Sequence, residues 1–196
     1  ILAPYIGTSF FVWTALIGFV LASLSLGYYL GGKWIDQKAE MSLPAFAFLG
    51  ASISLLLVLV IKDYFLHWVL DHVMGIKAAA IISSFVLFVP ASIFFGMIAP
   101  MVSKLLLIEL PNAGKTIGNV FAWGSIGSLL GTFLAGFYLL PNYSLTYILG
   151  SLCFISAIIA LAVFISKKKW LLSGIALLII ILGIWALIFD KNPSPY

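Results

Sequence analysis

Six long apolar runs in this sequence contain no Asp, Glu, Lys, Arg or His. They cover residues 6–32, 44–61, 78–103, 116–140, 145–165 and 171–189. A helix needs about 17 to 25 apolar residues to cross the hydrocarbon core of a bilayer, so each run is long enough to span it. Because the runs lack the alternation of β-barrel strands, only helices can satisfy their backbone in lipid. The sequence predicts an all-α, polytopic transmembrane helix bundle with six spans within residues 1–190.

The composition agrees with a membrane domain and narrows the choice of partners. Hydrophobic residues make up 64% of the chain and charged residues 8%, whereas about a quarter of a soluble domain is charged. The net charge of +4 comes from ten lysines in loops, without a basic stripe. We therefore expect the lipid bilayer as a partner and no nucleic acid. The single cysteine, Cys153, lies within the fifth run, which excludes a disulfide within one chain.

The lysines also predict an orientation. Seven of them follow the first, third and fifth runs, and three follow the second and sixth. Cytoplasmic loops carry the excess of lysine, so the loops near 33–43, 104–115 and 166–170 are predicted to be cytoplasmic. Both ends of the chain would then face outward. The expected location is a bacterial or archaeal plasma membrane.

The segment at about 63–76 is predicted to form a separate helix along the membrane interface. Asp63, His67 and Asp71 recur at intervals of four residues and would give it a polar face. A metal site at His67, Asp71 and His72 is the alternative. However, His72 points about 100 degrees away from Asp71 on a helix, and no third ligand helix is evident. We predict no metal site.

Two of the runs resemble each other. Residues 18–30 align without a gap on residues 127–139, with five identities. Three crossings separate the two runs, so they pass through the bilayer in opposite directions, as in a three-plus-three inverted repeat. The alternative is that glycine-rich packing helices look alike by coincidence. The glycines expected at helix contacts are Gly18, Gly27, Gly124, Gly127, Gly131 and Gly136.

Small residues and prolines predict local features of two spans. In the fourth run Gly124, Ser128 and Thr132 recur every four positions, a spacing that lets helix backbones approach closely. We therefore expect the fourth span at the centre of the bundle. Pro90 and Pro100 are expected to bend or break the third span.

Several motifs carry a family resemblance. They are Ile1–Ser9, Ser25–Lys33 with Asp36, Phe95–Pro100, Gly124–Phe137 and the final Ser194–Tyr196. Together they resemble the membrane part of membrane-fused spermidine synthase-like proteins. The resemblance implies a soluble C-terminal aminopropyltransferase domain, with residues 191–196 as the start of the linker. That domain would transfer an aminopropyl group from its co-substrate, decarboxylated S-adenosylmethionine, to putrescine.

None of that chemistry is encoded in this chain. It has no glycine-rich nucleotide loop after a strand and no paired acidic residues that could hold a diamine. We therefore expect this chain alone to have no enzymatic activity and no cofactor. A weaker resemblance links the loop motif of Gly32 and Asp36 to major facilitator transporters, but the pattern departs from that motif from Gln37 onward.

Three functions are compatible with the sequence. The chain could anchor or scaffold an aminopropyltransferase-type domain and handle its substrate or product. It could be a major-facilitator-like transporter or half-transporter, or a structural subunit that packs against partner helices or a second copy. The candidate substrate-binding residues are Trp13, Tyr28, Tyr29, Asn119, Trp123 and Tyr138. Cation–π contacts contribute about 0.5–2 kcal/mol each, and the runs contain no carboxylate, so an anchor is favoured over a polyamine pump.

Overall fold

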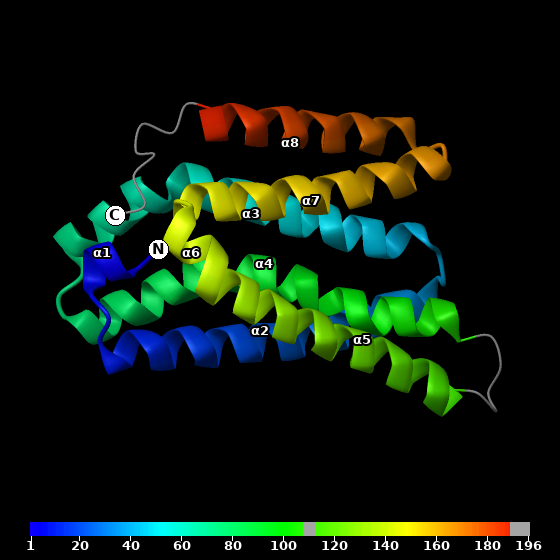
Figure 1. Cartoon of the computed structure of the whole chain (residues 1–196), viewed down its shortest axis with the longest axis horizontal. Helices are drawn as coiled ribbons and strands as arrows, with labels where there is room; N and C mark the ends of the chain where they lie inside the picture. Colours follow the sequence, from blue (N-terminus) through cyan, green and yellow to red (C-terminus); the bar gives the residue numbers. More distant parts are fainter. Residues whose placement is uncertain (108–112, 189–196) are drawn as a thin grey trace.

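The computed structural model of the chain describes residues 1–107 and 113–188, and all of its regular elements are helical (Figure 1). The helices are α1 (Ala3–Ile6), α2 (Phe10–Gln37), α3 (Ser42–His72), α4 (Ile76–Leu106), α5 (Ala113–Phe133), α7 (Leu145–Ser166) and α8 (Trp170–Ile188). A π-helical stretch, η2 (Leu134–Leu139), and the short α6 (Leu140–Asn142) continue α5. This confirms the all-α prediction. The predicted linker at 191–196 lies outside the described residues.

Within the described parts of the chain, five helices are long and apolar enough to cross a membrane. They are α2, α3, α4, α5 with its continuation, and α7. The sixth predicted span corresponds to α8, which is also apolar. Its apolar segment, Trp170–Ile184, is shorter than those of the other five helices. The protein is therefore an integral membrane helical protein. Successive long helices alternate in direction, so α2 and α4 run parallel (Figure 1).

The closest contact in the bundle joins α2 to α4. Ser23, Gly27 and Gly31 are buried at intervals of four residues on α2. A side chain at Gly27 would meet the backbone of Ile93 and Gly96, and one at Gly31 would meet the backbone of Met97. Small residues at this spacing allow two backbones to approach closely, which favours helix association in lipid. Two of the resembling motifs, Ser25–Lys33 and Phe95–Pro100, thus face each other in the fold.

The next helix, α3, packs against both α4 and α7. The Ser52 hydroxyl donates to the Cys153 carbonyl oxygen at 2.9 Å, and the Cys153 thiol donates to the Ser52 carbonyl oxygen at 3.3 Å. Near the start of α3 and the end of α7, the buried Phe164 ring meets Phe46 edge to face, with centroids 5.2 Å apart. α8 packs on α7 and completes this side of the bundle.

Two local predictions differ from the structure. The expected interfacial helix at 63–76 is instead the last part of α3, which continues to His72. No Gly or Pro lies between Lys62 and His72, and Leu66 and Val69 are fully buried in a cluster with residues of α1 and α4. The prolines were expected to bend or break the third span, and the break is wrong, because α4 passes through both Pro90 and Pro100 as one helix. Neighbouring helices on two sides of α4 support its halves across the missing hydrogen bonds.

The central position expected for the fourth span is wrong. None of the residues of α5 is buried, and α5 rests on α4 at the edge of the bundle. A Cβ at Gly124, Gly127 or Gly131 would meet nothing within 4 Å. The spacing of small residues allows close approach but does not supply a neighbour. Within residues 113–188, α5 makes no contact with α8 comparable to that of α2 with α4, which an inverted repeat would pair in the same way.

Candidate functional site

The described charged side chains lie near the ends of the long helices, and most gather at one end. This end, here called the lysine-rich end, comprises the ends of α2, α4 and α7 and the starts of α3 and α8. Asp36 and Lys104 form an ion pair at 3.0 Å between α2 and α4. Glu40 pairs with Lys38 at 2.8 Å and with Lys169 at 3.5 Å. Charged residues that follow the first, third and fifth apolar runs therefore meet in space.

The Glu40 cluster ties the loop between α2 and α3 to the turn between α7 and α8. Glu40 accepts from the Ser42 hydroxyl at 2.9 Å, and Lys169 donates to the same hydroxyl oxygen at 3.0 Å. The hydrogen bond from Lys38 has the largest effect, followed by the bond from Ser42, and together with the nearby lysine charges they lower the pKa of Glu40 from 4.5 to about 2.

We expect this cluster to make stability depend on pH in the acidic range. The folded-state pKa of Glu40 lies below the unfolded value, so its stabilisation is present above about pH 4.5. It is lost as the pH falls from about 4.5 toward 2. Glu40→Gln should therefore lower the thermal unfolding temperature at pH 7, and the difference from wild type should shrink below about pH 4.5 and be nearly gone at about pH 2. The exposed Asp71→Asn at the opposite end is the control. A difference that persists unchanged at pH 2.5 would contradict this.

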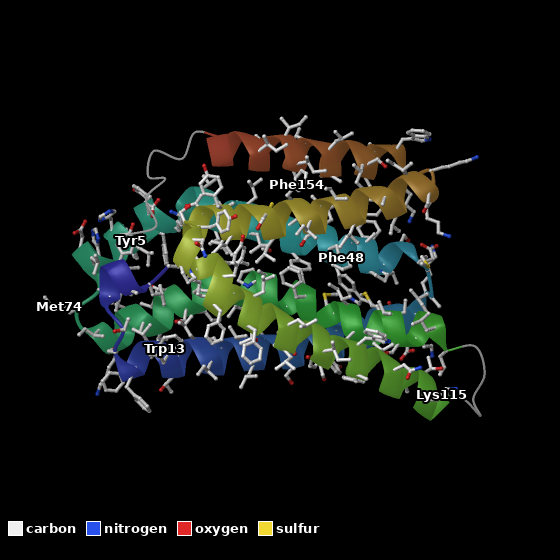
Figure 2. All side chains as sticks on the ribbon, in the orientation of Figure 1. Tyr5, Trp13, Phe48, Met74, Lys115 and Phe154 are labelled. Carbon is white, nitrogen blue, oxygen red and sulfur yellow. The ribbon has the colours of Figure 1, made fainter. Side chains whose placement is uncertain are left out.

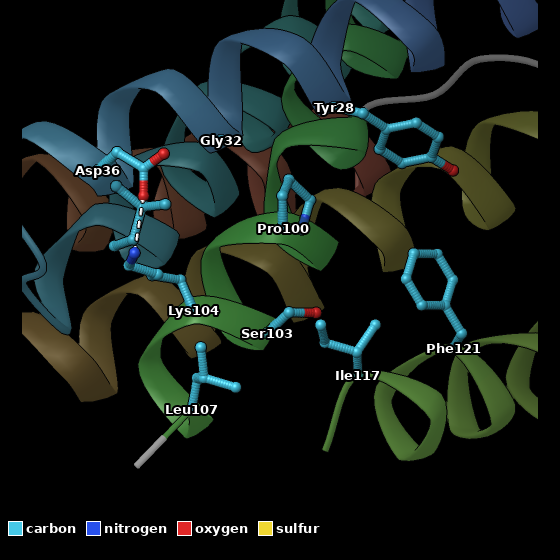
Figure 3. A pocket seen from close by; sticks show the side chains of 10 residues that line it. Tyr28, Gly32, Asp36, Pro100, Ser103, Lys104, Leu107, Ile117 and Phe121 are labelled. Carbon is cyan, nitrogen blue, oxygen red and sulfur yellow. Dashed lines mark ion pairs between the residues drawn. The ribbon is translucent and has the colours of Figure 1, made fainter. Parts of the chain in front are cut away.

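A cleft opens beside the Asp36–Lys104 pair, between α2, α4 and α5 (Figure 3). We call it the α2–α4–α5 cleft. It has a volume of about 400 Å³, and its lining residues are Tyr28, Gly32, Ile35, Asp36, Pro100, Ser103, Lys104, Leu107, Ile117 and Phe121. The buried Ser103 hydroxyl oxygen has no hydrogen-bond partner among the described residues. The cleft is thus apolar, with one ion pair and one unpaired hydroxyl.

A second cleft of about 750 Å³ lies between α4 and α5. Phe95 and Ile98 of α4 line it together with Asn119 and Trp123 of α5. The two clefts exist because α5 touches α4 along a narrow contact instead of packing into the bundle.

The structure does not bring the predicted substrate-binding residues together. Tyr28 lines the α2–α4–α5 cleft, whereas Asn119 and Trp123 line the second one. Tyr138 lines a separate hollow with Tyr143 and Tyr147 near the other end of α5. Trp13 lies far from Lys115, toward the opposite end of the bundle (Figure 2). Tyr29 is exposed and lines none of these hollows.

The predicted packing and motif residues are also separated. Gly27 lies at the α2–α4 contact. An added Cβ would meet nothing within 4 Å at the other predicted packing glycines, which are Gly18, Gly124, Gly127, Gly131 and Gly136. Gly32 and Asp36 were assigned to a loop motif, but both lie inside α2, whose last residue is Gln37. Ser103, Ile117 and Phe121 were not identified from the sequence. A single Ser in an apolar run resembles a packing residue. Its position next to Lys104 was the only feature of the sequence that could have identified it as a site residue.

The opposite end carries a smaller polar cluster. The Tyr5 hydroxyl donates to Asp63 Oδ1 at 2.8 Å, and the Tyr5 ring meets His67 edge to face. Burial, together with the hydrogen bond to Asp63 and its negative charge, raises the pKa of Tyr5 to about 12. Among the described residues, no group of His, Cys, Asp and Glu could hold a metal ion. We attribute a structural role to this cluster, which joins α1 to the end of α3.

No protein-family model, curated protein or solved structure matches the chain.

Proposed function

We propose that the chain is the membrane domain of a spermidine synthase-like fusion protein, in which it anchors and scaffolds a C-terminal aminopropyltransferase-type domain. The motifs quoted above suggest the family. The observation that carries the anchoring role is the interior of the bundle, where the described core consists of apolar residues and serines without an ionisable side chain other than Cys153. Intramembrane charges mark ion and substrate pathways, and this core offers none.

The packing of the resembling motifs also supports an anchor over a transporter. Ser25–Lys33 and Phe95–Pro100 meet where Gly27 lies against Gly96, so this part of the interface is closed by backbone atoms. The candidate polyamine-binding residues lie apart, as described above. A second role, packing against partner helices or a second copy, is favoured by the open glycine face of α5.

The liposome assay separates an anchor from a transporter. We expect that liposomes reconstituted with the purified chain will accumulate labelled putrescine and spermidine no faster than protein-free liposomes. Without an intramembrane carboxylate, a polycation would lose its hydration with only weak aromatic compensation. Saturable uptake that depends on the chain would overturn the anchoring proposal and favour the major-facilitator-like alternative.

The side of the membrane on which the chain ends tests the aminopropyltransferase part. A domain that uses decarboxylated S-adenosylmethionine requires a cytosolic signal from a side-specific reporter fused after Tyr196. The lysine bias predicts the opposite side, and α8 runs back from the lysine-rich end (Figure 1). A reporter inserted between Lys38 and Met41 is the matched control and should give the opposite signal. An external signal after Tyr196 would rule out cytosolic aminopropyl transfer.

A further inference from the structure

The wall of the α2–α4–α5 cleft matches an apolar chain. Its volume of about 400 Å³ falls within the range of about 300–1,000 Å³ that is usual for small-molecule sites. Tyr28, Pro100, Ile117 and Phe121 present carbon surface from three helices. Because these helices span a membrane, the medium beside them is hydrocarbon. A lipid acyl chain can therefore lie against this carbon surface without burying a polar group of its own.

The rim of the cleft carries one positive and one negative charge. The side chains of Lys104 and Asp36 are 47% and 64% exposed, so their mutual contact leaves both accessible. An ammonium group has three donors and a carboxylate has about four acceptor positions, and the 3.0 Å contact uses one of each. Lys104 can still bind an anionic group, and Asp36 can still bind a cationic group that donates hydrogen bonds.

Ser103 lies between the apolar wall and this charged rim. It precedes Lys104 on α4, and its hydroxyl oxygen is buried without a partner among the described residues (Figure 3). A buried hydroxyl without a partner is unfavourable, because it has lost its contact with water and has gained no other hydrogen bond. An ester carbonyl at this depth would accept its hydrogen bond. Charged rim, hydroxyl and apolar wall follow one another in the order of head group, ester and acyl chain in a phospholipid.

We propose that the α2–α4–α5 cleft binds a phospholipid whose head group carries both a phosphate and a primary ammonium. The phosphate binds Lys104, the ammonium donates to Asp36, and an acyl chain lies against Ile117 and Phe121. A head group with only negative charge would place that charge beside Asp36. A quaternary ammonium has no N–H to donate to Asp36. The geometry thus favours phosphatidylethanolamine over phosphatidylcholine and phosphatidylglycerol with the same acyl chains.

The test is lipid retention by the purified chain in detergent, measured by native mass spectrometry. Phosphatidylethanolamine, phosphatidylcholine and phosphatidylglycerol with identical acyl chains are added at equal concentration. We expect phosphatidylethanolamine to be retained about two- to fivefold more than the other two, the preference that one half-exposed ion pair provides. Equal retention of all three lipids, or preferred retention of phosphatidylglycerol, would overturn the proposal.

Three variants assign the preference to this cleft. Asp36→Asn should bring phosphatidylethanolamine and phosphatidylcholine to about equal retention, because it removes the charge that attracts the ammonium. It also removes the ion pair with Lys104, but that loss is common to all three lipids. Gly32→Leu should lower retention of both, since Gly32 lines the cleft and an added Cβ meets no protein atom within 4 Å. Gly18→Leu, on the same helix and equally open, is the control and should retain the wild-type preference. An unchanged preference in Asp36→Asn would overturn the proposal even if Gly32→Leu did not fold.

Discussion

Gly27→Ala is expected to separate α2 from α4 and to lower the free energy of unfolding by about 3 kcal/mol or more, the upper end of the usual cost of overpacking. The added Cβ would collide with the Ile93 carbonyl oxygen and lie 3.0 Å from the Gly96 Cα. Both obstacles are backbone atoms, so no side-chain rotation can relieve them. Gly31 meets the same obstacle, because a Cβ there lies 2.5 Å from the Met97 carbonyl oxygen.

The direction in which Gly27→Ala changes the free energy of unfolding separates the interhelical contact from helix propensity. Alanine stabilises an isolated helix relative to glycine by about 1 kcal/mol, so destabilisation by Gly27→Ala can only come from the interhelical contact. Gly18→Ala, in the same helix with nothing within 4 Å, should be neutral or slightly stabilising. Unfolding by denaturing detergent, followed by loss of the monodisperse chromatographic peak, measures both variants. Equal stability of the two would show that α2 and α4 do not pack through Gly27.

The spans could be predicted because hydrocarbon leaves the backbone few options. Apolar runs without charge place helices with little ambiguity, and the prediction of 145–165 lies within one residue of α7. Boundaries near the interface were less well determined. The Asp63–Asp71 stretch carries helical periodicity, but periodicity does not show whether a helix begins anew or continues from the preceding span. Burial of Leu66 and Val69 against other helices favours continuation.

The partners of each helix could not be predicted, since small-residue spacing is a property of one helix and packing is a property of two. Gly27 and Gly136 occupy equivalent positions in the aligned stretches. Gly27 lies against Gly96, whereas Gly136 lies in the π-helical η2 that continues α5, and nothing lies within 4 Å of a Cβ added there. The set of site residues predicted from the sequence was incomplete for the same reason. Asp36 and Lys104 are 68 positions apart, and only the parallel packing of α2 and α4 makes them neighbours at the cleft.

Phe164→Ala is expected to be the most damaging truncation of a single side chain in the bundle. Phe164 is fully buried and is the largest such side chain among the described residues. It packs edge to face on Phe46 and joins the cluster that includes Ala45, Leu49 and Ala160. Phe-to-Ala changes in cores cost about 3–5 kcal/mol. In lipid the solvent-transfer part is smaller, but the cavity and lost dispersion contacts remain, so we expect about 2–3 kcal/mol.

Phe137→Ala provides the matched comparison for this prediction. Phe137 is 78% exposed, also lies in a membrane span, and loses the same atoms. Its removal should change stability by less than about 0.5 kcal/mol, as for other surface substitutions. Unfolding in denaturing detergent at equal protein-to-lipid ratio measures the difference between the two variants. Equal destabilisation of Phe164→Ala and Phe137→Ala would contradict this prediction. It would mean that removal from water, and not packing in the interior, controls stability here. The α3–α7 core would then have to be looser than its contacts indicate.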